Sequence, residues 1–386
     1  MNKQVEKGKT LLIDGPASVT LISGKAEVFG FKVKESKKIV IREGKRLPFA
    51  ILETASINVS LGANAGVEEK EGDTIPNSWS EAYRIIRGVQ KKPIVIMVVG
   101  GVDSGKTSFC TYLTNKMIND KFKVAVLDED LGQSDVGPPS TVAYAHVVSP
   151  VTDLFSLAPE NVVFIGTTSA GAATKITVEG TAFLKKEIEK VAKADFIVIN
   201  TDGWAGSDEA ALFKSELAKS VEPDVIFCLE TKDEQPSICA SFGDALAGFR
   251  QERADSPTNV KERSKEKRRD LRELGFAKYL ENAHLKVFPL NYVIVEGKND
   301  NALIKDRKAD NLLVGLFDAK KKFLGIGVLR EIDYTRKSLK VHTSVTEKPA
   351  SVIFGKIRLD EKLHEIPENG EVKILAGKEV ANLSRK

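Results

Sequence analysis

The chain has 386 residues, of which 42% are hydrophobic and 29% are charged, and its formal net charge is +4. At roughly 100–200 residues per domain, this length predicts more than one domain. The mild charge argues against nucleic-acid binding over the whole surface, so any basic patch must be local. The N-terminus lacks the apolar run of a signal peptide, and the longest apolar run, Ile94–Val99, is too short to span a bilayer. We therefore expect an intracellular, cytoplasmic protein.

The cysteines and histidines argue against a structural zinc site and against a disulfide framework. Cys110, Cys228 and Cys239 lie far apart, and the four histidines are scattered. No C-x-x-C pair is present. Because structural zinc sites and disulfide scaffolds need such spacings, we expect neither.

The first 75 residues are typical of a β domain. Short β-type runs separated by Gly-containing turns lie at Ser18–Ile22, Ala26–Phe29 and Lys38–Ile41. A connector rich in Gly, Asn and Glu follows over residues 62–77. Ser78 can then cap a helix, with Glu81 three residues later as in a capping box.

Residues 76–290 alternate between strand-like and helix-like segments. The strand candidates are apolar on both faces, and they lie at Ile94–Val99, Val124–Leu127, Val162–Ile165, Phe196–Ile199 and Val225–Leu229. Strands of this kind are typical of a parallel sheet covered by helices on both faces, an α/β fold. Such sheets bind ligands beyond the carboxyl ends of their strands.

Residues 291–386 change in character again and predict a small β-rich C-terminal domain. Its β-like runs lie at Leu312–Phe317, Phe323–Leu329, Leu339–Thr343 and Ser351–Ile357. No chemical motif stands out in this part of the chain.

A phosphate-binding loop lies directly after the first central strand. Residues 100–107 read G-x-x-x-x-G-K-T, and a helix is expected over Ser108–Asn119. In this strand–loop–helix context the backbone N–H groups converge on phosphate oxygens, and the helix N-terminus adds positive potential. Lys106 can reach the β- and γ-phosphates, and the Thr107 hydroxyl can ligate Mg²⁺. The predicted nucleotide-binding residues are Gly100, Gly101, Val102, Asp103, Ser104, Gly105, Lys106, Thr107 and Ser108, and the predicted fold is that of a P-loop NTPase.

The second central strand ends in a cluster of acids, Asp128-Glu-Asp130. An acid in this position typically orients Mg²⁺ or the attacking nucleophile. Of two carboxylates two residues apart, one can hold the metal's water shell while the other accepts a proton from a hydroxyl. A solvated acidic turn is the alternative. Asp202, at the end of the fourth strand, is a rival candidate for the metal-orienting acid.

Two further pieces lie at strand ends and are open to two readings each. The Gly137-Pro-Pro loop near Gln133 is either a wall of the site or a plain turn. Trp204, between Gly203 and Gly206, is either part of the core or a flat surface on which a base can stack.

A basic stretch runs from Lys261 to Arg272, in which seven of twelve residues are Lys or Arg. It can be a solvated helical face, or it can supply arginines to a γ-phosphate. On an ideal helix Lys261, Lys265, Arg268 and Arg272 share one stripe. Arg263 lies off this stripe and needs a helix start or kink to join it.

Taken in order, these pieces resemble the polyribonucleotide 5′-hydroxyl kinases. This family includes archaeal polynucleotide kinases, the RNA kinase subunit of eukaryotic pre-mRNA cleavage factor II and rRNA-processing kinases. The similar segments are Ile22–Gly30, Gly100–Thr107, Asp128–Thr141, Phe164–Thr168, Asn200–Trp204 and Val260–Arg272. A guanine-binding GTPase is not expected, because an N/T-K-x-D loop would need Asp where this chain has Glu234.

The resemblance implies roles for individual residues. Lys106 and Thr107 would hold the phosphates of ATP and Mg²⁺, with Asp128 and Asp130 as further metal-site candidates. Asp130 would also be the base that activates the 5′-hydroxyl. Residues expected at the substrate end are Gln133, Thr168 and Trp204, with Trp204 stacking on the terminal base. The arginines of a lid over the phosphoryl group would be Arg263, Arg268 and Arg272. Adenine is expected between the N-terminal and central domains.

The sequence thus predicts an ATP- and Mg²⁺-dependent kinase that phosphorylates the 5′-hydroxyl of RNA, with single-stranded DNA as an alternative acceptor. RNA-processing proteins are expected partners, and the sequence does not determine the oligomeric state. An ATP-binding scaffold of an RNA-processing complex is the first alternative. The second is a P-loop ATPase or small-molecule kinase unrelated to RNA.

Overall fold

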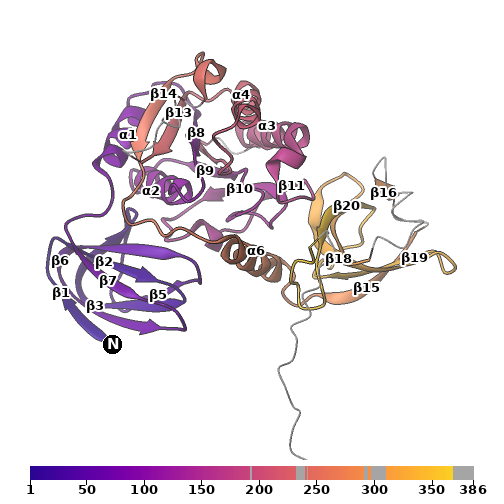
Figure 1. Cartoon of the computed structure of the whole chain (residues 1–386), viewed down its shortest axis with the longest axis horizontal. Coiled ribbons are helices and arrows are strands. Elements are labelled where there is room, and N and C mark those ends of the chain that lie inside the picture. The colour runs from indigo at the N-terminus through magenta and orange to yellow at the C-terminus, as the bar shows by residue number, and fades with distance from the viewer. Residues whose placement is uncertain (192–193, 232–239, 241, 291–293, 297–309, 368–386) are drawn as a thin grey trace, which may run out of the picture.

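The chain is built around three β-sheets that follow one another in the sequence (Figure 1). The computed structural model describes residues 1–191, 194–231, 240, 242–290, 294–296 and 310–367. The N-terminal sheet packs below the central α/β layers, and the C-terminal sheet lies to one side of them. Among the helices of these described ranges, none is both long and apolar enough to cross a membrane.

The N-terminal sheet is antiparallel and has seven strands in the order β4-β3-β6-β2-β7, with β1 on β6 and β5 on β3. Their bounds are β1 Asn2–Val5, β2 Lys9–Asp14, β3 Ala17–Val28, β4 Phe31–Lys32, β5 Lys38–Ile41, β6 Arg46–Leu61 and β7 Val67–Glu71. Two expectations were wrong here. The predicted turn before Ala26 is instead a set of register shifts within β3, and the predicted connector contains β7.

The central sheet has seven strands in the order β11-β10-β9-β12-β8-β13-β14. Their bounds are β8 Ile94–Gly100, β9 Val124–Asp128, β10 Thr141–Val147, β11 Asn161–Phe164, β12 Phe196–Asn200, β13 Val225–Glu230 and β14 Gln251–Asp255. The five strands from β9 to β14 in this order are parallel, which confirms the prediction for β9, β12, β8 and β13. The expectation of a wholly parallel sheet was wrong, because β10 pairs antiparallel with both β9 and β11.

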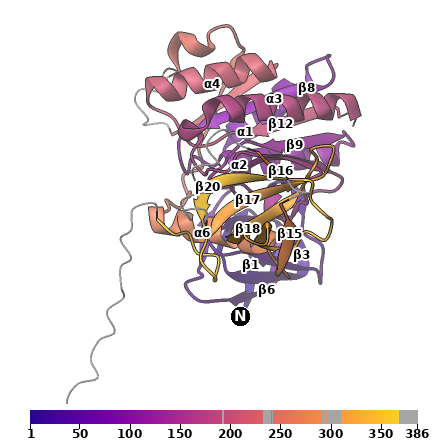
Figure 2. The same cartoon turned by 90° about the vertical axis from the view of Figure 1, so that its right-hand side faces the viewer.

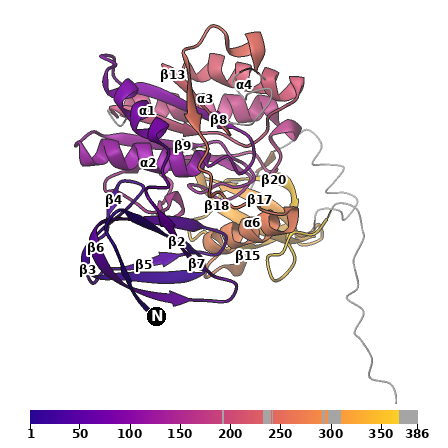
Figure 3. The ribbon, with the colours of Figure 1, turned by 60° about the vertical axis from the view of Figure 1, so that its left-hand side comes forward.

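Helices cover both faces of the central sheet, and the strands divide their apolar side chains between two cores. The helices are α1 Asn77–Arg87, α2 Lys106–Asn119, α3 Thr174–Val191, α4 Asp208–Val221 and α6 Lys265–Tyr279, and the 3-10 turns are η1 Leu154–Ser156, η2 Ala170–Ala172 and η3 Gly243–Leu246. Along β8, Ile94, Ile96 and Val98 join the core that includes α1, α2 and the N-terminal sheet. The alternate residues Val95 and Met97 join the core under α3 and α4. Helix α2 therefore lies between the central and N-terminal sheets (Figure 3), whereas α3 and α4 form the outer layer (Figure 2).

The start of α1 differs from the expected capping box. The helix begins at Asn77, and no side chain caps it. The Ser78 hydroxyl instead accepts a hydrogen bond from Asp255 N of β14, and Glu81 pairs with Arg84. The local capping motif was overridden because these side chains make tertiary and i,i+3 contacts.

The C-terminal sheet has six strands in the order β15-β19-β18-β17-β20-β16. Their bounds are β15 His284–Pro289, β16 Ile294–Glu296, β17 Leu312–Phe317, β18 Phe323–Asp333, β19 Ser338–Thr343 and β20 Ser351–Arg358. Because β15 pairs with β19, this sheet begins before the boundary predicted at residue 291. Helix α6 runs from the N-terminal sheet toward the C-terminal sheet beneath the central layers (Figure 1).

The two cysteines that the structure describes differ in state. Cys110 is free and buried in α2, whereas Cys228 of β13 is disulfide-bonded. The wide spacing of the cysteines in the sequence gave no sign of this bond. Cys239 lies outside the described residues.

Candidate active site

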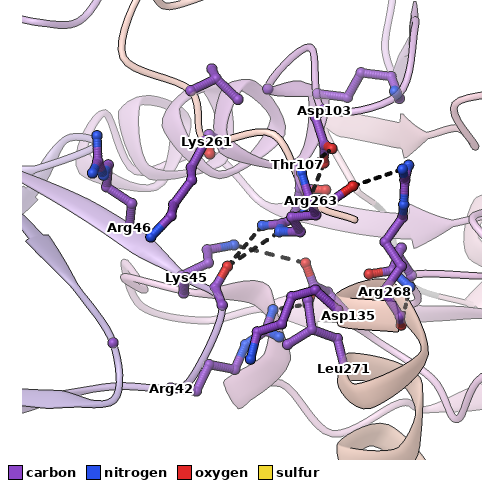
Figure 4. Close-up of a pocket in the computed structure, with 18 of the residues that line it drawn as sticks. Arg42, Lys45, Arg46, Asp103, Thr107, Asp135, Lys261, Arg263, Arg268 and Leu271 are labelled. Atoms are coloured by element: carbon purple, nitrogen blue, oxygen red, sulfur yellow. Dashed lines mark hydrogen bonds and ion pairs between the residues drawn. The ribbon is translucent and has the colours of Figure 1, made fainter. Parts of the chain in front are cut away.

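A cavity of about 380 Å³ lies where the N-terminal sheet, the phosphate loop and the start of α6 meet (Figure 4). Most predicted site residues line it, namely Val102, Asp103, Ser104, Gly105, Lys106, Thr107, Ser108, Asp130, Gln133, Arg263, Arg268 and Arg272. The predicted residues that do not line it are Gly100, Gly101, Asp128, Thr168 and Trp204. The sequence therefore brings residues from three distant segments to one cavity.

The phosphate loop has the geometry that its glycine and lysine predict. Gly105 has a φ of +94°, a left-handed conformation that favours glycine, and α2 starts at the next residue. Lys106 is buried, and its Nζ donates to the carbonyls of Gly100 at 3.0 Å and Gly101 at 2.6 Å. Burial lowers the pKa of Lys106, although the charge of Asp130 opposes this effect. The lysine thus lies folded over its own loop, beside the cavity.

Asp128 is fully buried and anchors the loop that follows it. Its Oδ2 accepts hydrogen bonds from the backbone of Asp135 at 2.6 Å and Val136 at 3.1 Å. Its Oδ1 accepts one from Asn200 Nδ2 at 2.9 Å, and the same amide approaches Thr107 Oγ1 at 3.5 Å. Burial and the nearby carboxylates raise the pKa of Asp128 to about 7. Both of its oxygens therefore have protein partners, and Asn200 connects it to the phosphate-loop threonine.

Asp130 faces the cavity from the same loop. Its Oδ1 accepts hydrogen bonds from the backbone of Gly132 at 3.0 Å and Gln133 at 2.8 Å. Its Oδ2 has no hydrogen-bond partner within the described ranges. Burial, and next the charge of Asp202, raise the pKa of Asp130 above that of an ordinary aspartate. A carboxylate with one oriented oxygen and one available oxygen is suited to accept a proton.

The basic stretch is only partly helical, and this places Arg263 in the site. Helix α6 begins at Lys265, and the Ser264 hydroxyl caps it by accepting from Lys267 N. Lys261 and Arg263 therefore precede the helix, so the single helical stripe expected from Lys261 onward was wrong. Because α6 starts only after Arg263, this residue is not confined to the position it would have on a continuous helix. The side chain of Arg263 reaches the phosphate loop.

Each predicted lid arginine is held by a different partner. Arg263 Nη1 lies 3.2 Å from Asp103 Oδ1, and its guanidinium also donates to the carbonyl of Gly44 (Figure 4). Arg268 Nη2 donates to the carbonyl of Arg263 at 2.7 Å. Arg272 donates to both oxygens of Glu365, at 2.6 Å and 2.7 Å.

Gln133 and the Gly137-Pro-Pro loop connect the acidic loop to α6. Gln133 Nε2 donates to the carbonyl of Arg268 at 3.0 Å. Pro139 lines the cavity, and a Cβ on Gly275 of α6 would lie only 2.7 Å from its ring. Because Pro139 lines the cavity, the structure favours the interpretation of this loop as a wall of the site over that of a plain turn.

Trp204 lies beside the cavity rather than in its lining. The indole is half-buried, stacks on Phe213 with ring centroids 5.8 Å apart, and packs against the small residue Gly171. Gly203, one residue earlier, lines the cavity, and a Cβ there would lie 2.8 Å from the Val102 side chain. The tryptophan is therefore a partly exposed platform next to the phosphate loop.

Sequence reasoning missed the basic residues that the N-terminal sheet contributes. The turn after β5 adds Arg42 and Lys45 to the cavity, and the first residue of β6 adds Arg46. Arg42 pairs with Asp135 and, at 2.7 Å, with Asp153, and Lys45 lies 3.2 Å from Asp153. The signal was present as the basic, Gly-containing run Arg42-Glu-Gly-Lys-Arg46. No motif connected this run to the phosphate loop.

Comparisons with known proteins agree with this arrangement. A family model described as mRNA cleavage and polyadenylation factor CLP1 P-loop matches residues 100–282. A polyribonucleotide 5′-hydroxyl kinase of Methanocaldococcus jannaschii is 28% identical, with 76% of this chain and 94% of that protein covered. A kinase of the same name from Pyrococcus furiosus is also 28% identical, with 72% and 90% covered.

A solved structure supports the fold. The structure of a wild-type Clp1p–Pcf11p complex superposes with a TM-score of 0.74 over 93% of this chain and 97% of that chain, at 14% identity. At this identity the likeness shows the P-loop α/β fold with its flanking β-rich parts. The sequence matches show that the chain is similar to the polyribonucleotide 5′-hydroxyl kinases and, over residues 100–282, to the CLP1 P-loop family.

Proposed function

We propose that this protein is an ATP-dependent kinase that transfers the γ-phosphate to the 5′-hydroxyl of RNA. One observation carries the proposal: Lys106, Asp130, Arg263 and Arg268 line the same cavity. In-line phosphoryl transfer needs cations around the γ-phosphate and a group that takes the proton of the attacking hydroxyl. These four side chains supply both functions.

Each residue would act on one part of the transfer. Asp130 accepts the proton of the 5′-hydroxyl as its oxygen attacks the γ-phosphorus. Lys106 exchanges its loop carbonyls for the β- and γ-phosphates, whose negative charge is a stronger partner. Arg263, Arg268 and Arg272 close over the γ-phosphate and stabilise the charge that develops there. Positioning and electrostatics thus account for most of the rate enhancement.

The donor set suits Mg²⁺, which prefers oxygen ligands. Thr107 would hold the ion directly, and Asp128 would act on its water shell because both of its oxygens already accept hydrogen bonds. When bound, the ion would neutralise charge on the phosphates.

The adenine of ATP and the terminal nucleotide of the acceptor would bind in different places. Apolar cavity residues between the N-terminal sheet and the phosphate loop, including Leu12, Phe29 and Pro48, offer a surface for adenine. Trp204, with Gln133 and Thr168, would receive the terminal nucleotide of the acceptor, since bases stack on exposed aromatic rings.

The test is transfer of labelled γ-phosphate from ATP to a short single-stranded RNA with a 5′-hydroxyl, with a 5′-phosphorylated RNA as the blank. Matched DNA oligonucleotides would establish the choice of acceptor. Label on the hydroxyl RNA only, lost in Lys106→Ala and Asp130→Ala, is the expected result. ATP binding without transfer to any acceptor would contradict it and favour a nucleotide-dependent scaffold. ATP turnover indifferent to RNA would favour an unrelated ATPase.

A further inference from the structure

A fully buried lysine lies below the candidate site and has no role in the chemistry described so far. Lys214 of α4 has a side-chain exposure of 1%, and its Nζ lies 3.0 Å from Asp202 Oδ1 and 3.4 Å from Glu129 Oε2. Glu129 is also fully buried, and Asp202 is nearly so. The three side chains come from α4, the end of β9 and the end of β12.

The two carboxylates belong to the two loops on which the proposed reaction depends. Glu129 directly precedes Asp130 in the sequence, and its Oε2 also accepts a hydrogen bond from Asp202 N at 3.1 Å. Asp202 Oδ1 accepts one from the backbone nitrogen of Trp204 at 2.7 Å. One ammonium group therefore joins the loop of the candidate base to the loop of the candidate stacking surface.

This arrangement is a costly way to stabilise a core. Two carboxylates share one lysine, and Glu129 Oε1 and Asp202 Oδ2 are buried with no hydrogen-bond partner among the described residues. Replacing buried ion pairs by well-packed apolar side chains is often neutral or stabilising. The contribution of this network is therefore better explained by the positions it fixes than by the stability it adds. The geometry fixed here is the separation of two loops.

We propose that Lys214 is a positioning residue for the transfer reaction: it holds the Asp130 loop and the Trp204 loop in register, so that a nucleotide stacked on Trp204 presents its 5′-hydroxyl to Asp130. This inference rests on the proposed function. Lys214 touches neither substrate, because its side chain is fully buried behind the two loops. Its effect is transmitted through Glu129 and Asp202.

The test compares wild type with Lys214→Met, using Lys185→Met as the matched control. Lys185 is likewise a buried lysine with a carboxylate partner, Glu189 at 2.8 Å, but it lies on α3 away from both loops. In Lys214→Met, kcat/KM for the RNA should fall about 100-fold, as a misplacement of about 1 Å can cause, while the KM for ATP changes less than twofold. The control should keep both values within twofold.

A second readout does not depend on activity. The chain has two tryptophans, so subtracting the emission of the matching Trp204→Phe variant isolates Trp204. Acrylamide quenching of Trp204 should rise at least twofold in Lys214→Met and stay unchanged in Lys185→Met. If wild type transfers no phosphate, the proposed function fails. The quenching result still decides whether Lys214 fixes the Trp204 loop.

A double variant guards against simple loss of folding. Asp202→Asn with Lys214→Met removes one of the two carboxylates that lose the lysine and keeps an oxygen acceptor for Trp204 N, so it should regain part of any lost thermal stability. Its kcat/KM for RNA should remain low, because the lysine link between the loops is still absent. Recovery of kcat/KM together with stability would overturn the proposal, as would equal losses with RNA and ATP in the single variant.

Discussion

Arg263 donates to Asp103 twice, from its backbone nitrogen to Oδ2 at 3.0 Å and from Nη1 to Oδ1 at 3.2 Å. The first lid arginine is thus held on the phosphate loop itself. We expect Arg263→Ala to lower kcat about 100-fold, the usual cost of losing one donor to a transition-state charge. Asp103→Ala should lower kcat less, because it frees the guanidinium without removing it. Steady-state kinetics would compare the two, and a larger effect of Asp103→Ala would show that Asp103 has a separate role.

Arg268→Ala should lower kcat far more than it raises the KM for ATP, because its guanidinium would act chiefly in the transition state. Arg269 is the matched control. It is the next residue on α6, pairs with Glu273 at the surface and does not line the cavity. Its replacement by Ala should leave both constants within about twofold. A change confined to the KM for ATP in Arg268→Ala would contradict the lid role.

Asp130→Asn should lower kcat by about 10²–10⁴-fold, the range of general-base contributions. The base must be ionised, so activity is present above the folded-state pKa of Asp130 and is lost as the pH falls through it. Because burial raises this pKa, the acidic limb of the kcat profile should lie above the pH expected for an ordinary aspartate. A profile recorded from pH 4 to 9 tests this, and an acidic limb that persists unchanged in Asp130→Asn would assign it to another group.

Arg42→Ala should destabilise the fold by leaving Asp135 and Asp153 without their main partner. Breaking a buried ion pair typically costs about 3–5 kcal/mol, and the loss here should be somewhat smaller because Lys45 remains 3.2 Å from Asp153. Lys25→Ala is the control, since its pair with Glu53 is exposed to solvent and such pairs contribute little to stability. Urea unfolding measures both, and equal losses would contradict a special role for the Arg42 network.

Much of the fold follows from local patterns in the sequence. The runs Lys38–Ile41 and Leu312–Phe317 form the strands predicted, because alternating or continuous apolar residues have few other ways to be buried. Strand β10 was not among the predicted strands although it is as apolar as its neighbours, and its antiparallel direction was not predictable because strand direction leaves no mark on hydrophobicity. Strand β14 was missed because its sequence, Gln251-Glu-Arg-Ala-Asp255, is almost wholly polar.

The candidate site was predictable where a motif dictates backbone geometry. The phosphate loop and Asp130 reach one cavity because each follows a strand end at the same edge of the sheet. The lid arginines reach it from α6 and the residues directly before that helix. Partners from other domains were not predictable. Nothing in the sequence couples Arg42 to Asp135, 93 residues away, or Arg272 to Glu365, 93 residues away. The burial of Lys214 was likewise not predictable, because this lysine lies in a helix with an ordinary amphipathic pattern.

The cavity is assembled from segments that leave the ribosome at very different times. Its lining includes Leu12 of β2, the phosphate loop and Arg272 of α6. A nascent chain that ends within the central sheet would therefore display a complete phosphate loop with an unfinished nucleotide site. Of the segments that line the cavity, the one that carries the lid arginines is synthesised last. The chain would therefore make its full set of contacts with the nucleotide only after most of its fold has formed.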